Sequence, residues 1–176
     1  MEKPFAFSNR EFNAVRQKIR SLTGINLADS KDNMVYSRLS RRLRALKLTS
    51  FQAYLDYLDN HQGETEHFIN SLTTNLTSFF REAHHFEQLA EYLHVHPEPL
   101  RIWCTASSSG EEPYSIAMTC AEARGSLNTN VKIYASDIDS RMLERAKAGI
   151  YPIDQVEKLS LARRKRFFHR GTGSNA

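Results

Sequence analysis

The stretch LRIWCTASSSGEEPYSIAMTCAEA (100–123) decides the fold that this sequence predicts. It opens with LRIWCTA (100–106), a short apolar run rich in strand-forming residues. The small polar loop SSSGEE follows, and Pro113 then suits the first turn of a helix, PYSIAMTCAEA. Glu111 and Glu112 stand near the start of that helix, where the helix dipole favours negative charge. The stretch therefore predicts a strand, a loop and a helix in succession.

The same succession repeats directly afterwards. A turn at Gly125 and SLNTN leads to a second apolar run, VKIYAS (131–136), which Asp137 ends before the helical segment SRMLERAKA. Strand–loop–helix repeated in this way is the opening of a doubly wound, Rossmann-like α/β sheet. Two strands cannot bury both faces of a parallel sheet, and RGTGSNA resembles a flexible tail. We therefore expect a truncated sheet that further sequence normally completes.

Upstream of this sheet, the sequence predicts a small all-helical domain. Ser8 and Glu11 form a capping box for a first helix, which Gly24 is placed to end. Thr49 and Gln52 form another capping box ahead of a third helix. Short helices joined by turns are therefore expected over this part of the chain.

The domain organisation follows from these patterns. Gly63 is expected to break the chain before a fourth helix. We predict an α + α/β architecture: a helical domain over residues 1–75, a linker and connecting helix over 76–99, and a partial α/β domain over 100–176. The composition, with 40% hydrophobic and 10% aromatic residues, fits a soluble globular protein with a real core.

The second helix, expected from about Lys31 to Lys47, carries the clearest charge pattern. Its apolar stripe is formed by Val35, Leu39, Leu43 and Leu46. The arginines of this helix are Arg38, Arg41, Arg42 and Arg44. Such a basic cluster, in a chain of net charge +4, predicts an anionic partner: nucleic acid, a membrane face or an acidic protein surface. A solvated helix face is the alternative, and the lack of interleaved aromatic residues argues against a platform for single-stranded nucleic acid.

Other features of the sequence narrow the class of protein. No stretch approaches the ~20 apolar residues of a membrane span, and MEKPFAFSNREF lacks the apolar core of a signal peptide, so a cytoplasmic protein without membrane insertion is expected. Cys104 and Cys120 are expected to be buried free thiols. The spacing of His84, His85, His94 and His96 matches no standard zinc site, so no metal is expected.

Ligands of open α/β sheets bind at the carboxyl ends of the strands, which here are 105–112 and 136–139. The first loop has one glycine, Gly110, rather than a G-x-G-x-x-G fingerprint, although its small serines let the backbone approach a ligand. Asp137 is placed to accept both hydroxyl hydrogens of a ribose. The pattern thus admits a nucleoside-type cofactor, and the alternative is an ordinary turn in which Asp137 caps the next helix.

Three segments, LTTNLTSFFRE (72–82), TASSSGEEPYS (105–115) and YASDID (134–139), together resemble the CheR family of chemotaxis receptor methyltransferases. RLSRRLRAL and RGTG also fit that family in order and spacing, so the resemblance covers essentially the whole chain. Ser109 is a mild departure, because family members often have threonine there. The resemblance implies a protein-glutamate O-methyltransferase that uses S-adenosyl-L-methionine, leaves S-adenosyl-L-homocysteine and serves signal transduction in chemotaxis.

The resemblance also implies roles for individual residues. Those that it places against the cofactor are Asn75, Thr77, Arg81, Ala106, Ser107, Ser108, Glu112 and Asp137. Arg81 would lie near the reacting methyl group as the catalytic residue, and its fork of donors could hold the acceptor carboxylate. Glu112 would contact the amino-acid end of the cofactor and Asp137 its ribose.

These polar residues also have structural interpretations. Asn75 and Thr77 suit a turn or cap between domains, and Arg81 could form a surface ion pair with Glu82 or Glu87.

The resemblance also implies a partner. It is the glutamate-rich helical region of methyl-accepting chemotaxis receptors, which the basic helix would contact. Because a glutamate acceptor is already ionised near neutral pH, it needs no general base, and rate would come from orientation and exclusion of water.

Two other hypotheses remain open at this point. The chain could bind receptor or cofactor without catalysis, because the predicted sheet is truncated. On basic charge alone, it could be a nucleic-acid-binding domain.

Overall fold

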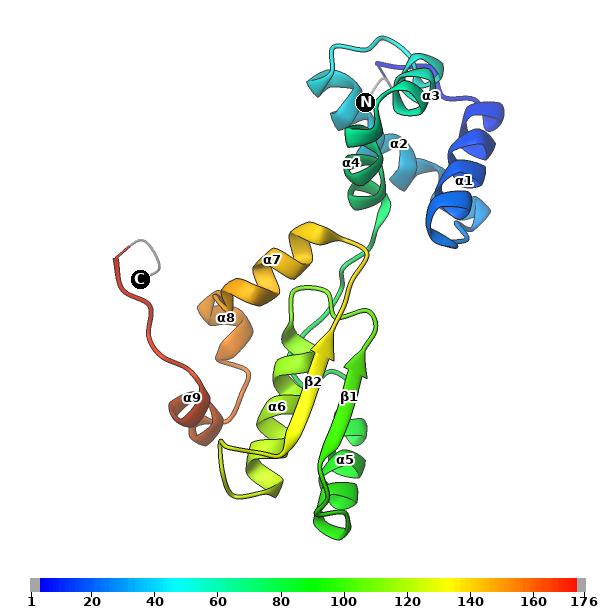
Figure 1. Ribbon diagram of the computed structural model, residues 1–176. Coiled ribbons are helices and arrows are strands. Elements are labelled where there is room, and N and C mark those ends of the chain that lie inside the picture. Colours follow the sequence, from blue (N-terminus) through cyan, green and yellow to red (C-terminus); the bar gives the residue numbers. More distant parts are fainter. Residues whose placement is uncertain (1–3, 174–176) are drawn as a thin grey trace. The chain divides into compact units, whose positions relative to one another are not determined.

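The computed structural model describes residues 4–173. The chain forms two compact units, Met1–Thr74 and Asn75–Ala176, and each is considered by itself. Figure 1 shows helices alone in the first unit and a small sheet with helices in the second. The predicted fold, an all-helical part followed by the start of an α/β sheet, is confirmed.

The helical unit is built around one apolar core. Its elements are α1 (Asn9–Thr23), a 3-10 turn (Asp29–Lys31), α2 (Asp32–Ala45), α3 (Phe51–Asn60) and α4 (Gln62–Leu72). Every one of the four α-helices contributes fully buried side chains, among them Val15, Leu39, Phe51 and Phe68. The rings of Phe7 and Phe51 pack with centroids 4.3 Å apart. Amphipathic helices thus close a core from nearby segments of the chain.

The helix ends agree only in part with the sequence patterns. The capping box of Ser8 and Glu11 is present, and Gly24 ends α1 with a φ of 77°. The prediction for α3 was wrong by one residue, because Ser50 rather than Thr49 accepts from the Ala53 N–H at 3.1 Å. Gly63 lies inside the first turn of α4, and the break falls at His61. Since several residues there can cap a helix, local pattern alone does not choose among them.

The second unit contains a short parallel sheet. Its elements are α5 (His84–Val95), β1 (Leu100–Cys104), α6 (Glu111–Ala123), β2 (Val131–Ala135), α7 (Ser140–Ala148), α8 (Ile153–Val156) and α9 (Leu161–Phe167). The strands pair in parallel register from Leu100 opposite Val131 to Cys104 opposite Ala135. Both predicted strands and both following helices are therefore present.

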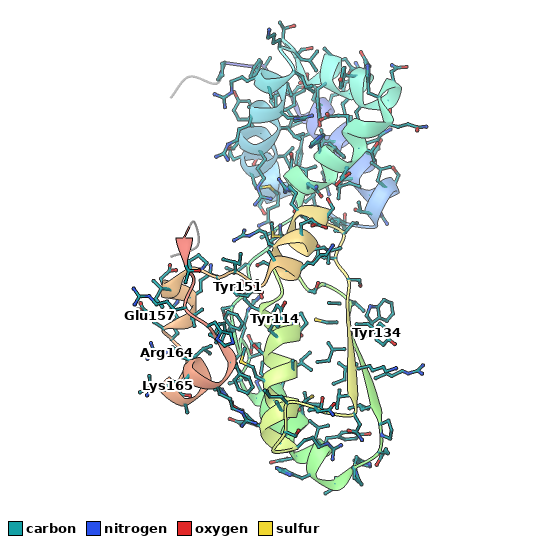
Figure 2. All side chains as sticks on the ribbon, turned by 60° about the vertical axis from the view of Figure 1, so that its left-hand side comes forward. Tyr114, Tyr134, Tyr151, Glu157, Arg164 and Lys165 are labelled. Atoms are coloured by element: carbon teal, nitrogen blue, oxygen red, sulfur yellow. The ribbon has the colours of Figure 1, made fainter. Side chains whose placement is uncertain are left out.

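The two faces of the sheet differ. On one face, Ile102 and Ile133 pack against a cluster that includes Phe86 of α5 and Ile116 of α6. On the other face, Trp103 is 69% exposed and its partner in register, Tyr134, is 52% exposed. Figure 2 shows Tyr134 on the side of the strands away from α6. Helices therefore cover one face of this sheet within the described residues.

Two further expectations concern buried and apolar features. Cys104 and Cys120 are free and buried, as predicted. Within residues 4–173, no helix is long and apolar enough to cross a membrane.

Candidate functional site

The loop after β1 continues the strand pairing before it turns. The Ser136 N–H donates to the Cys104 carbonyl at 2.9 Å, and the Ser107 N–H donates to the Ser136 carbonyl at 3.0 Å. The chain then passes through left-handed backbone at Ser108 and Gly110, with φ values of 46° and 100°. These bonds hold the ends of β1 and β2 beside each other, although the two ends lie about 30 residues apart in the sequence.

Gly110 cannot be replaced by a larger residue without movement. A Cβ atom built there would lie 2.7 Å from the Tyr151 hydroxyl and 2.9 Å from the Ala146 Cβ. The Tyr151 hydroxyl donates to the Ser109 carbonyl at 2.7 Å, so it is held in this place. Burial, and then the negative charge of Glu111, raise the pKa of Tyr151, which keeps the hydroxyl protonated. The single glycine of the loop thus serves close packing against the segment after α7.

The two glutamates that open α6 have different environments. Glu111 is buried and accepts from the Ser109 hydroxyl at 2.8 Å and 3.0 Å. Glu112 is exposed and lies close enough to Cys104 to influence it. Burial, and then the charge and hydrogen bonding of Glu112, raise the pKa of the Cys104 thiol to about 12. The Glu112 carboxylate is therefore the accessible negative group at the end of β1.

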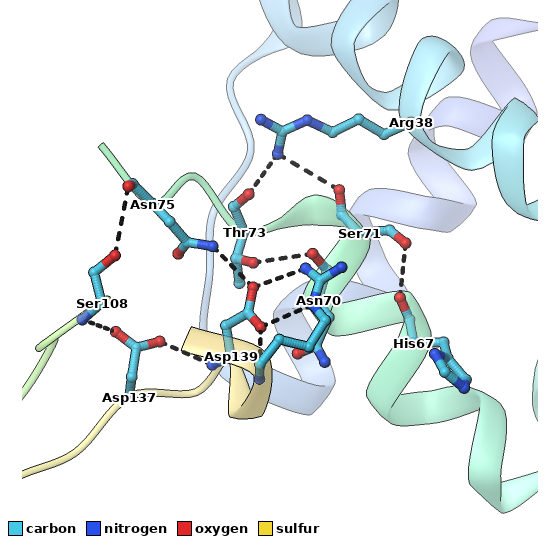
Figure 3. Close-up of polar contacts among 10 residues, drawn as sticks. Arg38, His67, Asn70, Ser71, Thr73, Asn75, Ser108, Asp137 and Asp139 are labelled. Atoms are coloured by element: carbon cyan, nitrogen blue, oxygen red, sulfur yellow. Dashed lines mark hydrogen bonds and ion pairs between the residues drawn. The ribbon is translucent and has the colours of Figure 1, made fainter. Parts of the chain in front are cut away.

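Asp137 is fixed by main-chain donors at the end of β2. The Ser108 N–H donates to its Oδ2 at 2.7 Å, and the Asp139 N–H donates to its Oδ1 at 2.8 Å (Figure 3). The interpretation of Asp137 as the cap of α7 is wrong, because Asp139 is the N-cap residue. A carboxylate offers about four acceptor positions, so two main-chain bonds leave room for hydroxyl donors.

Asn75 joins this group from a distant part of the sequence. Its Nδ2 donates to Asp139 Oδ2 at 2.8 Å, and its carbonyl accepts from the Ser108 hydroxyl at 3.4 Å. Figure 3 shows Asn75, Ser108, Asp137 and Asp139 joined by these bonds. Four residues at three strand or loop ends therefore form one connected polar group within the second unit.

The turn that carries Arg81 has unusual backbone. Phe80 and Glu82, on either side of Arg81, have φ values of 52° and 54°, in the left-handed region that non-glycine residues rarely adopt. Arg81 is exposed, and its Nη1 donates to the Leu76 carbonyl at 2.9 Å. No ion pair of Arg81 with Glu82 or Glu87 is found within the described residues. Such backbone costs of order 1–3 kcal/mol per residue, so neighbouring contacts must hold it.

Three neighbours hold this turn. The Phe80 N–H donates to the buried Ser115 hydroxyl of α6 at 3.0 Å. The guanidinium of Arg163 lies over the Phe80 ring, 3.8 Å from its centroid, and is itself bonded to Glu122 at 2.8 Å and 2.9 Å. Phe79 is buried in a second small cluster of the same unit. Contacts with α6, with α9 and with the small apolar cluster therefore hold the turn in place.

Three other residues predicted for the cofactor lie outside this polar group. Ala106 is exposed, Thr77 is half-buried and Ser107 is buried. Two cavities of about 460 Å³ each lie along α6 and β2, and residues such as Tyr114 and Ala117 line both. Neither is lined by the residues predicted for the cofactor, which lie at the carboxyl ends of the strands.

The arginines of α2 are not equally accessible. Arg42 donates to both carboxylate oxygens of Glu64 at 2.6 Å, and the Tyr54 hydroxyl donates to Glu64 at 2.9 Å. Arg38 donates to the carbonyls of Ser71 and Thr73. Arg42 and Arg38 thus serve contacts inside the helical unit.

Arg41 and Arg44 are the exposed arginines of this helix. Arg44 also donates to the Ser40 carbonyl at 3.2 Å. These two arginines therefore carry the outward charge that the sequence pattern predicted for α2.

Glu64 is the buried charge of the helical unit. Burial alone would raise the pKa of its carboxyl, but hydrogen bonds from Arg42 and Tyr54 outweigh that effect and hold the pKa below its ordinary value. The same burial and the Glu64 contact raise the pKa of Tyr54. The sequence pattern placed Arg42 in a basic cluster for an anionic partner and gave no sign of Glu64 as its partner within the unit.

The strand-end group suits a particular kind of ligand. Asp137 and Glu112 supply two carboxylates, which favour a ligand with positive charge and adjacent hydroxyl groups. S-adenosylmethionine has a sulfonium, an ammonium and a ribose diol, so the residues present fit it. Within the described residues, no group of three or more metal-ligating side chains is found. A parallel sheet with carboxylates at its strand ends is the arrangement that nucleoside-binding α/β domains use.

Comparison with known proteins identifies the family. Residues 75–176 match the family model described as CheR methyltransferase, SAM binding domain, and residues 10–73 match CheR methyltransferase, all-alpha domain. The chain therefore belongs to the CheR methyltransferase family, and its second unit corresponds to the SAM binding domain of that family.

Relatives are similar along nearly the whole chain. Chemotaxis protein methyltransferase 2 of Pseudomonas aeruginosa is 53% identical over 176 residues, which cover 98% of this chain and 62% of the relative. Chemotaxis protein methyltransferases of Escherichia coli and Salmonella typhimurium are each 49% identical over 175 residues, covering 98% of this chain and 61% of each relative. The chain thus spans about three fifths of the length of these relatives.

Three residues that hold the strand ends and the turn of Arg81 in place were not predicted from the sequence. The sequence patterns assign Asp139 no role, although an aspartate directly before a helical pattern is a typical N-cap. Ser115 and Tyr151 gave no signal, because their bonds join segments that lie far apart in the sequence.

Proposed function

We propose that the whole protein transfers a methyl group from S-adenosylmethionine to glutamate side chains of methyl-accepting chemotaxis receptors, leaving a methyl ester and S-adenosylhomocysteine. The connected group of Asn75, Ser108, Asp137 and Asp139 at the strand ends is the observation that carries this proposal. The names of the relatives, chemotaxis protein methyltransferases, support the chemotaxis context.

Each end of the cofactor has a counterpart in the second unit. Asp137, with its carboxylate held by two main-chain N–H groups, would accept hydrogen bonds from the ribose hydroxyls. Glu112 would attract the ammonium, since it is exposed at the start of α6. Ala106, Ser107 and Ser108 would lie along the cofactor with their backbone. When bound, the cofactor supplies an activated methyl group.

Arg81 is the proposed catalytic residue. Its exposed side chain stands on a turn whose backbone is held in a rare conformation, which is typical of functional sites. A guanidinium can hold a glutamate carboxylate through two parallel hydrogen bonds and so orient the acceptor. Because that carboxylate is ionised near neutral pH, no general base is required. Asn75 and Thr77 complete the proposed lining of the site.

The helical domain predicted over residues 1–75 is proposed to dock on the acidic methylation region of the receptor, with residues 76–99 joining it to the cofactor-binding part. Arg41 and Arg44 carry exposed positive charge on α2, while Arg38 and Arg42 are half-buried. Long-range attraction would raise the rate of encounter, and added salt would weaken it.

Cofactor binding by the chain is tested by isothermal titration with S-adenosylhomocysteine, using the parent and Asp137→Ala. We expect the parent to bind and the variant to lose at least about tenfold in affinity, because two ribose hydroxyls lose a charged acceptor. Absence of binding in the parent, or equal binding in both, contradicts the proposed site.

Methyl transfer is tested with a protein of the relatives' length and receptor membranes. A labelled methyl group that becomes base-labile on the receptor supports ester formation on glutamate. A second candidate is that these 176 residues bind cofactor or receptor without transfer, and the exposed outer face of the two-stranded sheet favours it. Full transferase activity of the 176-residue chain alone would overturn that candidate.

A further inference from the structure

Asp139 occupies a central position in the polar group at the strand ends. Its side chain is fully buried, and its carboxylate accepts from the Asn75 amide at 2.8 Å. It also accepts from Arg141 Nη2 at 2.9 Å and Nε at 3.1 Å, and from the Arg141 main chain at 3.2 Å. A carboxylate bound by a guanidinium, an amide NH₂ group and one main-chain N–H serves as a hydrogen-bond acceptor for all three.

The charge of Asp139 determines which way the Asn75 amide faces. An ionised carboxylate can only accept hydrogen bonds, so Asn75 must turn its NH₂ group towards Asp139. The amide oxygen is then left out of the bond to Asp139, which Figure 3 shows running from the amide nitrogen. Asn75 is therefore presented to its surroundings as an acceptor and not as a donor.

The same residue also steadies Asp137. The Asp139 N–H donates to Asp137 Oδ1 at 2.8 Å, and Asp139 caps α7, so the chain between the two aspartates is fixed. On the other side, Ser108 bonds to both Asp137 and the Asn75 carbonyl. Asn75 and Asp137 are thus held as two acceptors that are joined through Asp139.

We propose that Asp139 is a positioning residue for cofactor binding, which fixes the Asn75 amide oxygen as an acceptor for a donor group of the cofactor. This inference rests on the proposed function, since it requires Asn75 to line the cofactor site. Asp139 itself is buried and does not touch the ligand.

Exchanging the two side chains tests the proposal. Asp139→Asn permits the Asn75 amide to turn over, and Asn75→Asp places two carboxylates against each other. In the double variant, the amide at position 139 can again donate a hydrogen bond to the carboxylate at position 75. It also keeps an acceptor directed at the ligand, because a carboxylate at position 75 offers only acceptors. Asparagine is as good an N-cap as aspartate, so α7 is expected to keep its start in all variants.

The readout is the dissociation constant for S-adenosylhomocysteine by isothermal titration, with thermal unfolding of each variant in parallel. We expect each single exchange to weaken binding about tenfold and the double exchange to return it to within about threefold of the parent. Matched controls are Asp154→Asn and Asn128→Asp, both at exposed positions of the same unit, which should leave binding unchanged.

The outcomes separate this inference from the proposed function. Parent binding that the single exchanges do not weaken, or a double variant that stays as weak as the singles, overturns the role of Asp139 and leaves the proposed site standing. A parent that binds no S-adenosylhomocysteine overturns the proposed site, and this inference with it. Weakened singles with recovery in the double variant support both.

Discussion

The helical unit and the α/β unit bury their apolar residues in different ways. In the helical unit, large side chains such as Phe51, Tyr54 and Phe68 are fully buried in one cluster. In the α/β unit, the buried residues fall into two smaller clusters. Among the described residues, every exposed large hydrophobic residue except Leu22 belongs to the α/β unit. Helices close a core with their neighbours in sequence, whereas a parallel sheet needs further strands and helices on both faces.

The largest expected difference between the units is the loss of folding stability when a large aromatic residue is replaced by alanine. Phe51→Ala should destabilise the helical unit by about 3–5 kcal/mol, because it leaves a cavity in a closed core. Trp103→Ala removes a larger side chain but should cost less than about 1 kcal/mol, because Trp103 is mostly exposed. Urea unfolding followed by circular dichroism measures both. A large cost for Trp103→Ala would break the comparison, since it would mean that the outer face of the sheet is covered in solution.

The second prediction compares the buried carboxylate of Glu64 with an exposed carboxylate of the same helical unit. Glu64→Gln should cost about 2–3 kcal/mol at pH 7, because it leaves the guanidinium of Arg42 without its carboxylate partner. Asp59→Asn is the matched control: it removes an exposed ion pair with Lys18 and should cost about 0.5 kcal/mol or less.

The effect of Glu64 depends on pH. The folded pKa of Glu64 is lowered, so its stabilisation is complete above the ordinary glutamate pKa of 4.5 and is lost as the pH falls through the folded pKa. The difference between parent and Glu64→Gln should therefore shrink in acid, which unfolding titrations between pH 7 and pH 3 would measure. A difference that stays constant over this range would show that the charge of Glu64 is not what stabilises the unit.

A smaller loss of stability than those of Phe51→Ala and Glu64→Gln is expected in the α/β unit, at the turn that carries Arg81. Ser115→Ala should cost about 1–2 kcal/mol and speed hydrogen exchange at the Phe80 amide, because this N–H loses its acceptor. Thr119→Val, one turn further along α6, removes a buried hydroxyl that donates to a main-chain carbonyl already used in the helix. It should cost about 0.5 kcal/mol and leave the Phe80 amide protected. Equal exchange in the two variants would show that Ser115 does not hold the turn.

Much of the fold could be predicted from local pattern. The alternation of apolar strands with helical segments located β1, α6, β2 and α7 to within a few residues. The errors were local too, such as the cap of α3 at Ser50 and the position of Gly63 inside α4. Neighbouring residues with similar capping ability compete there, and tertiary packing chooses between them.

The candidate site was predictable only in its outline. The rule that ligands meet the ends of parallel strands indicated Asp137, and the resemblance to the CheR family added Glu112. The bond from Asn75 to Asp139 joins residues 64 positions apart, and that from Phe80 to Ser115 joins residues 35 apart, so no local pattern could indicate either.

The sequence by itself determined the class of the fold, the helical and α/β parts and the family, because periodicity and motifs are written in neighbouring residues. Only the tertiary structure decided that Asn75 bonds to Asp139, that Arg42 is engaged by Glu64, and that rare backbone flanks Arg81. The physical reason is that each of these depends on hydrogen bonds, burial or strain that arise only when distant segments meet.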